Sequence, residues 1–346
     1  MAERVVFHIG TPKTGTTYLQ TLVWRHRKRL QKQGLLFPGD RRGDHLWGSM
    51  EVRGDPNVKR RRSEAPGAWN RLSSAAAAWP QTVLISHEFY GAATPQQAAR
   101  ALGDLAPARI ELVVTARDAV SAVTSMWSQS MKFRHTASLR DFAAKDGEDD
   151  PLDVWGWRTL DTAHVLQRWS ADLAPSQVHI ITVPGRGSPP DELWRRFAGV
   201  LGVDPGVVDA TRAQPNDSLG LVETELLRML NTRLSREQMS AERTARWVRG
   251  YLARDVLVPH GRERFVPPAD QRAGLRRRAE RIVDDLAEAG YSVVGELADL
   301  LPSDDSGKRS PEDVTTAELL DAAADTIVTL FAEVRRLSDD GVEPPT

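Results

Sequence analysis

The chain alternates between short apolar runs and longer stretches in which apolar residues recur at helical spacing. The short runs are rich in β-branched residues and are typical of buried strands. They cover residues 5–9, 82–86, 109–116 and 177–183. The helical stretches between and after them cover residues 16–33, 69–79, 98–105, 119–127, 154–173 and 191–201. Strands that alternate with helices in this way indicate an α/β domain.

The last third of the chain is helical in pattern. Helical stretches are predicted at residues 221–234, 241–257, 268–289 and 316–337. The polar segment before the last of them is linker-like. We therefore expect a main domain at 1–302, a linker at 303–313 and a C-terminal amphipathic helix with its tail at 314–346. A helix with an apolar stripe docks on its own domain or pairs with a second copy of the chain, and we expect one of these two arrangements.

The segment between residues 35 and 62 is rich in turn-forming residues. A connection of this length in a compact domain is more often functional than accidental. Within it, the sequence Asp44-His45-Leu46-Trp47 places an imidazole close to an aromatic ring. We therefore expect His45 to line a pocket for an acceptor molecule.

Composition narrows the chemistry. The 346 residues include 46 basic and 47 acidic side chains, so no global field favours a nucleic-acid partner. The chain has no cysteine, which excludes disulfides, thiolate metal sites and cysteine nucleophiles. The amino-terminal residues lead directly into a strand without a signal-peptide pattern, and no run of about 18 apolar residues suggests a membrane span. We expect a cytoplasmic protein.

The first strand ends in a loop whose two glycines, Gly10 and Gly15, have the spacing of a phosphate-binding loop. A strand–loop–helix unit directs several backbone N–H groups and the positive end of a helix dipole at one point, which suits an anion. Nucleoside triphosphatases continue after the second glycine with Lys and then Ser or Thr. Here Thr16 and Thr17 follow instead, and the loop's lysine is Lys13.

This loop resembles the donor-binding loop of the sulfotransferases that use 3′-phosphoadenosine 5′-phosphosulfate (PAPS). In that family the loop holds the 5′-phosphosulfate, and its lysine stabilises charge on the bridging oxygen. The resemblance implies a set of donor-binding residues in this chain, which are Pro12, Lys13, Thr14, Gly15, Thr16 and Thr17.

A second resemblance lies about a hundred residues later, where Arg117 ends a buried strand and Ser125 follows at the family's spacing. In the family, such a pair holds the 3′-phosphate of the donor, and a guanidinium fork suits that role. The chain departs from the commonest form of the motif, because Asp118 directly follows the arginine and Ala119 stands where a proline is usual. Asp118 is also a good N-cap for the next helix.

His87 and Glu88 directly follow the strand at 82–86. In open parallel sheets, ligands bind outside the carboxyl ends of the strands, so both side chains are placed where chemistry is expected. In carbohydrate-type sulfotransferases a glutamate at the end of the second strand is the catalytic base, and related bacterial members carry a histidine-containing patch near the position of His45. The resemblance makes Glu88 the preferred base, while His45 and His87 remain alternatives.

The sulfotransferase resemblance implies a P-loop-type three-layer α/β fold with a central, mainly parallel sheet flanked by helices, to which this chain adds a C-terminal helical extension. It implies in-line transfer of a sulfuryl group from PAPS, without a metal ion, to a hydroxyl of a carbohydrate or of a small natural product. Two alternatives stay open: a P-loop kinase that uses ATP with magnesium, and a non-catalytic nucleotide-binding relative.

Overall fold

The computed structural model describes residues 2–145, 150, 152–185, 187–210, 218–235, 239–261, 263–303 and 307–339. The chain forms two compact units, each built from three segments. The first unit comprises residues 1–123, 146–214 and 275–303, and the second comprises residues 124–145, 215–274 and 304–346. The domain boundaries expected at 302 and 314 stay predictions, and residues 340–346 of the expected tail lie outside the described residues.

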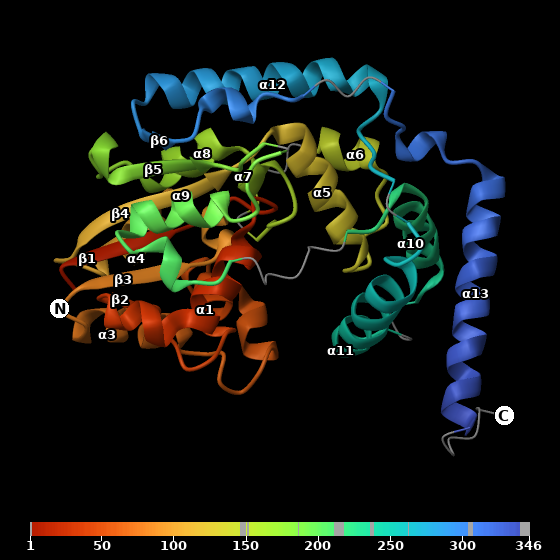
Figure 1. The fold of residues 1–346 in the computed structure, drawn as a ribbon, viewed down its shortest axis with the longest axis horizontal. Coiled ribbons are helices and arrows are strands. Elements are labelled where there is room, and N and C mark those ends of the chain that lie inside the picture. The colour runs from red at the N-terminus through yellow and green to blue at the C-terminus, as the bar shows by residue number, and fades with distance from the viewer. Residues whose placement is uncertain are drawn as a thin grey trace. The chain divides into compact units, whose positions relative to one another are not determined.

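A six-stranded sheet forms the centre of the first unit, and each neighbouring pair of strands is parallel. Its strand order is β2-β3-β1-β4-β5-β6, so β1 lies between β3 and β4 (Figure 1). The strands are β1 (Arg4–His8), β2 (Leu35–Leu36), β3 (Thr82–Ser86), β4 (Arg109–Ala116), β5 (Val178–Thr182) and β6 (Ser292–Val294). The predicted bounds of β3 and β4 agree with the structure, whereas the short strands β2 and β6 were not predicted.

Helices cover both faces of this sheet, which confirms the expected three-layer α/β fold (Figure 1). The helices that lie wholly within the first unit are α1 (Thr16–Lys32), α2 (Asp44–Val52), α3 (Ala68–Ala78), α4 (Pro95–Gly103), α7 (Trp157–Leu160), α8 (Thr162–Trp169) and α9 (Glu192–Leu201). A 3₁₀ turn, η2 (Glu88–Ala92), follows β3. Two further helices, α5 (Ala119–Met131) and α12 (Ala269–Glu288), each contribute residues to both units.

Alternating side chains of the central strand enter two separate cores, as the period of a strand requires. Val5, Phe7 and Ile9 pack with apolar residues of α3, α4, α8 and α12. Val6 enters the opposite core with residues of α1 and α9. His8 also lies near α9, and its ring centroid is 5.1 Å from that of Phe197. The buried sheet therefore holds the carboxyl end of β1 between two packed layers.

The second unit is helical. Besides part of α5 and α12, it contains α6 (Leu139–Ala144), α10 (Leu221–Arg233), α11 (Ala241–Arg243) with the π-helix Thr244–Leu257, and α13 (Thr316–Asp339). Helix α13 packs against α10 and the π-helix. In the part of the chain that the structure describes, every helix is too short or too polar to cross a lipid bilayer.

Two predicted elements are wrong in detail. The single helix expected at 154–173 is two short helices, because Asp161 leaves the helical conformation and accepts a hydrogen bond from the His164 N–H at the start of α8. The carboxylate of Asp161 is buried and lies 3.3 Å from Arg281 of α12. The turn-rich segment contains a nine-residue helix, α2, which begins at Asp44.

Candidate functional site

The loop after β1 keeps its two glycines for steric reasons. Gly10 has φ 129°, and a Cβ atom there would lie 3.0 Å from the carbonyl oxygen of Glu88. Gly15 has φ 87°, and its Cβ would lie 2.5 Å from Cδ2 of Leu193. Because L-residues rarely adopt such positive φ values, the chain can turn here only with glycine at low cost. The loop therefore lies directly against the backbone of Glu88.

Strand β4 holds the same loop through Thr115. The Thr115 N–H donates to the Gly10 carbonyl at 2.7 Å, and the Thr11 N–H donates to the Thr115 carbonyl at 2.9 Å. The hydroxyls of Thr14 and Thr115 are in hydrogen-bond contact, and the Thr14 hydroxyl also contacts the Thr11 carbonyl. All three threonines are buried. Side-chain and backbone bonds to β4 thus fix the shape of the loop.

Helix α1 begins directly after Gly15. The first intrahelical bond at its start joins the Leu19 N–H to the Gly15 carbonyl at 3.0 Å, so the N–H groups of Thr16 and Thr17 have no acceptor within the helix. No acidic residue lies in the first turn. Lys13 is half-buried, with φ 65° in the left-handed region. The loop thus combines a helix amino terminus with a lysine, an arrangement suited to an anion.

The polar end of β3 lies next to this loop. Glu88 begins the turn η2, and its side chain is 18% exposed. The side-chain amide of Gln20, on α1, donates to the carboxylate of Glu88 at 3.4 Å. Burial opposes ionisation of Glu88, but His87, its own backbone N–H, His8 and the hydroxyl of Thr16 outweigh that effect and keep its pKa below the usual value. Glu88 is therefore a carboxylate at neutral pH.

His87 is neutral at the same pH. Burial lowers its pKa, which outweighs the opposing charge of Glu88. Its Nδ1 accepts a hydrogen bond from the Phe89 N–H at 3.1 Å, so the proton of the neutral ring is on Nε2. The same Nδ1 lies 3.9 Å from the Glu88 carboxylate. With Nδ1 occupied as an acceptor, His87 caps the turn that presents Glu88.

His45 lies on α2, and both of its ring nitrogens contact backbone groups. Its Nε2 is 2.9 Å from the Pro38 carbonyl, and Nδ1 accepts a hydrogen bond from the Ser86 N–H at 3.2 Å. The ring stacks on Phe37 with centroids 4.1 Å apart. Burial lowers the pKa of His45 to about 3. The ring is thus neutral, with no lone pair left for a substrate proton, and it joins the long connection to the end of β3.

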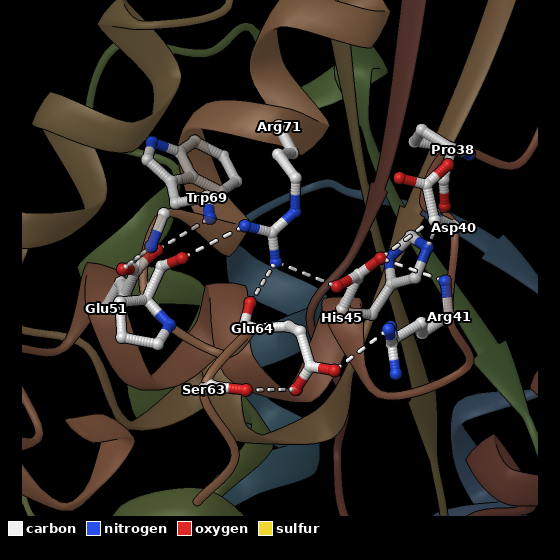
Figure 2. A network of polar contacts seen from close by, with 12 residues as sticks. Pro38, Asp40, Arg41, His45, Glu51, Ser63, Glu64, Trp69 and Arg71 are labelled. Carbon is white, nitrogen blue, oxygen red and sulfur yellow. Dashed lines mark hydrogen bonds and ion pairs between the residues drawn. The ribbon is translucent and has the colours of Figure 1, made fainter.

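A polar network holds this connection in place (Figure 2). One carboxylate oxygen of Asp44 accepts from the N–H groups of Asp40 and Arg41, at 2.9 and 3.0 Å. Its other oxygen lies 3.0 Å from Arg71 of α3. Arg71 also donates to the Glu64 carbonyl at 2.7 Å, and the side chain of Glu64 pairs with Arg41 at 2.9 Å. These contacts give the segment before α3 a defined conformation.

His8 was not among the predicted site residues, yet it connects the ends of three strands. Its Nδ1 is 2.8 Å from the Ser86 hydroxyl of β3, and its Nε2 is 3.3 Å from the Thr115 hydroxyl of β4. The side chain is fully buried, and this burial lowers its pKa to about 4. The sequence feature that indicates such a residue is a histidine at the carboxyl end of a mostly apolar strand. His8 is a neutral link beneath the loop.

Arg117 directly follows β4, at the same edge of the sheet as the loop and Glu88. Its Nε lies 3.6 Å from the Asp118 carboxylate, and the other oxygen of that carboxylate caps α5 through the Ser121 N–H at 2.7 Å. The predicted N-cap is therefore confirmed. Ser125 lies on α5 but belongs to the second unit, so its joint role with Arg117 stays a prediction.

The connections after β1 and β4 lead in opposite directions along the sheet. The chain passes from β1 to β2 at one edge, and from β4 to β5 on the other side. In open α/β sheets, ligands bind outside the carboxyl ends of strands where this reversal occurs. The loop after β1 and Arg117 after β4 flank that point, and Glu88 follows the neighbouring strand β3. The topology thus gathers the predicted residues of the first unit at the carboxyl ends of the central strands.

No protein-family model and no curated protein sequence matches the chain. Its structure is similar to that of a sulfotransferase from Alicyclobacillus acidocaldarius, with 19% identity, a TM-score of 0.43, and coverage of 69% of this chain and 98% of that one. It is also similar to the sulfotransferase domain from the curacin biosynthetic pathway, with 13% identity, a TM-score of 0.37, and coverage of 84% and 98%. At these values the likeness assigns no activity to this chain.

Proposed function

We propose that this protein is a sulfotransferase that moves a sulfuryl group from PAPS to a hydroxyl of a carbohydrate or of a small natural product. One observation carries the proposal: an anion-binding loop lies against the backbone of a carboxylate that its surroundings keep ionised. The loop suits the donor's phosphosulfate, and the carboxylate suits removal of a proton from an attacking hydroxyl.

The residues of the loop fit an anionic donor. The N–H groups of Thr16 and Thr17 precede the first bond of α1, so they have no acceptor within the helix and can bind an anion. When bound, PAPS supplies the sulfuryl group and a second phosphate on its ribose. Lys13 would stabilise negative charge at the oxygen that links phosphate to sulfate. Arg117, with Ser125, would hold the 3′-phosphate.

Glu88 is the base in this proposal. A carboxylate that is ionised at neutral pH and part-exposed beside the loop can accept a proton as the acceptor oxygen attacks. His87 and His45 are less suited, because each uses Nδ1 to accept a backbone hydrogen bond and burial lowers the pKa of both rings. We assign them to positioning: His87 shapes the turn η2, and His45 fixes the end of β3.

The kinase alternative is weaker for a chemical reason. A nucleoside triphosphatase loop has a lysine directly after its second glycine, where it reaches the β- and γ-phosphates. This chain has Thr16 there, and its side chain interacts with Glu88. A non-catalytic relative would bind the donor without transferring sulfate, which the labelled-donor experiment below tests.

Calorimetric titration with 3′-phosphoadenosine 5′-phosphate and with ATP and magnesium tests the donor assignment. We expect the bisphosphate to bind and ATP to bind at least tenfold more weakly. Arg117→Ala should remove that preference, whereas Arg109→Ala, at the amino end of the same strand, should retain it. A preference of the unmodified protein for ATP with magnesium would refute the proposal. Incubation with labelled PAPS and cell extract then identifies the acceptor, and donor binding without any labelled product would favour the non-catalytic alternative.

A further inference from the structure

Helix α13 carries a row of large apolar side chains that no other part of the described chain covers. These residues are 47% to 71% exposed, and they are Leu320, Ile327, Val328, Phe331 and Val334. The opposite side of the helix is already packed: Thr326 is buried, and the Thr329 hydroxyl lies 3.4 Å from Nε2 of His260 in the same unit. The exposed row therefore lies on the side of α13 that faces away from the core of the unit.

The spacing of this face is that of a coiled-coil seam. Exposed positions follow one another at alternating intervals of four and three residues, namely Leu320, Ala324, Ile327, Phe331 and Val334. Such a 4-3 alternation keeps one stripe of a helix against a partner helix over several turns. An isolated amphipathic helix that binds a flat surface does not require it. The stripe thus fits another helix of the same kind.

Charge along the helix determines the direction of pairing. The amino-terminal half carries three acidic residues, Glu318, Asp321 and Asp325, and no basic one. In the carboxyl-terminal half two acidic residues offset two basic ones, and Arg336 pairs with Glu333 at 2.8 Å, which leaves Arg335 as the basic residue beside the stripe. Two parallel copies would place like charges side by side. Two antiparallel copies would separate the two acidic halves and place each beside a half without net charge, with Asp321 opposite Arg335 across the stripe.

The size of the face agrees with self-association. If each of the five large side chains offers about 100 Å² of exposed surface, two copies bury about 1,000 Å², which is the lower limit for a specific interface. Each copy exposes about 500 Å² here, in the upper part of the range for the largest apolar patch of a monomer, and such patches often have a function. We propose that the protein is a homodimer in which two copies of α13 pair antiparallel through this stripe.

Sedimentation equilibrium of the full chain tests the dimer. We expect twice the chain mass at micromolar concentration, and the mass of one chain for Phe331→Glu. Ala332→Glu introduces the same charge one residue away from the stripe and is expected to stay dimeric. Asp321→Arg and Arg335→Asp change exposed residues, so they keep the fold; each should weaken the dimer, and the double exchange should restore it.

The absence of cysteine allows the orientation to be measured with single spin labels. In the antiparallel pair, labels at Ala332→Cys, which lies off the stripe, are separated by about 12 Å along the helix axis, and labels at Ala317→Cys lie about 35 Å apart, at 1.5 Å of rise per residue. A parallel pair would give short distances at both sites. A monomer at every concentration, a dimer unaffected by Phe331→Glu, or short distances at both labels would overturn the proposal.

Discussion

Gly15 offers the sharpest test of the loop, because the structure separates two costs of replacing it. An alanine there must adopt φ 87°, and its Cβ meets the Leu193 side chain at 2.5 Å. Gly187 has φ 90°, and no atom lies within 4 Å of the position that a Cβ would take there, so Gly187→Ala carries the backbone cost alone. The two variants thus differ in one physical respect, the contact with Leu193.

The magnitudes follow from these two geometries. The left-handed conformation costs an L-residue about 1–2 kcal/mol, and about 0.4–1 kcal/mol of this is offset by the stiffer unfolded chain. Gly187→Ala should therefore destabilise by about 1 kcal/mol. Gly15→Ala adds the cost of turning the end of the half-buried Leu193 side chain away from the new methyl group, about 0.5–1.5 kcal/mol if the side chain leaves its preferred rotamer. For a unit of 150–250 residues, each kcal/mol lowers the melting temperature by about 2–4 °C.

Donor affinity provides the second measurement. A displaced loop would lose at least one hydrogen bond to a charged group, worth about 1.5–3 kcal/mol, so Gly15→Ala should bind 3′-phosphoadenosine 5′-phosphate at least tenfold more weakly. Gly187→Ala should bind it normally. Combining Gly15→Ala with Leu193→Ala in a double-mutant cycle isolates the steric part as a coupling energy. If both alanine variants show equal melting temperatures and equal affinities, the contact with Leu193 does not shape the loop and the reasoning fails.

Three further predictions concern the ionisable side chains of the candidate site. Glu88→Gln should lower the rate of labelled sulfate transfer about 10²–10⁴-fold with unchanged donor binding, while Glu3→Gln at the other end of β1 keeps both; transfer by Glu88→Gln at more than a tenth of the normal rate would contradict the assignment. Lys13→Gly and Lys13→Ala should both lose transfer, but the glycine variant should melt higher, because only it relieves φ 65°. Since His8 and His45 titrate near pH 4 and 3 in the fold but near 6.5 when unfolded, protonation favours the unfolded chain. Urea titrations should therefore give a free energy of unfolding that is highest above about pH 6.5 and falls below it by about 1.4 kcal/mol per pH unit for each of the two histidines. An unchanged urea midpoint between pH 7 and 5 would argue against neutral rings.

The sequence predicts best those parts whose conformation is decided locally. The bounds of β3 and β4 agree because both strands are rich in β-branched and apolar residues and bury side chains on both faces. The loop after β1 was recognisable from Gly10 and Gly15, whose positive φ values are a local requirement. The N-cap at Asp118 depends on the next three residues alone.

The errors arise where distant residues decide the local structure. Asp161 interrupts the expected long helix because its buried carboxylate faces Arg278 and Arg281, which lie more than a hundred positions later. Helix α2 forms in a turn-rich segment because Arg71, on another helix, binds the carboxylate of Asp44. Neither contact leaves a periodic signal in the sequence. His45 was likewise predictable as a polar residue near the site, but its contact with the Ser86 backbone depends on the folded connection.

The two halves of the candidate site are mechanically coupled. Gly10 has no side chain, and this allows the loop to touch the backbone of Glu88. Below that contact, the hydroxyl of Thr115 binds both Thr14 of the loop and His8, and His8 in turn binds Ser86 two residues before Glu88. These contacts connect the loop after β1 to the turn that carries the carboxylate. A group that removes a proton while a neighbouring bond to sulfur forms must keep its distance from the donor, and a chain of buried contacts through three strand ends supplies that constraint. In the proposed function, the buried and neutral His8 is thus a positioning residue between the loop and the turn that carries Glu88.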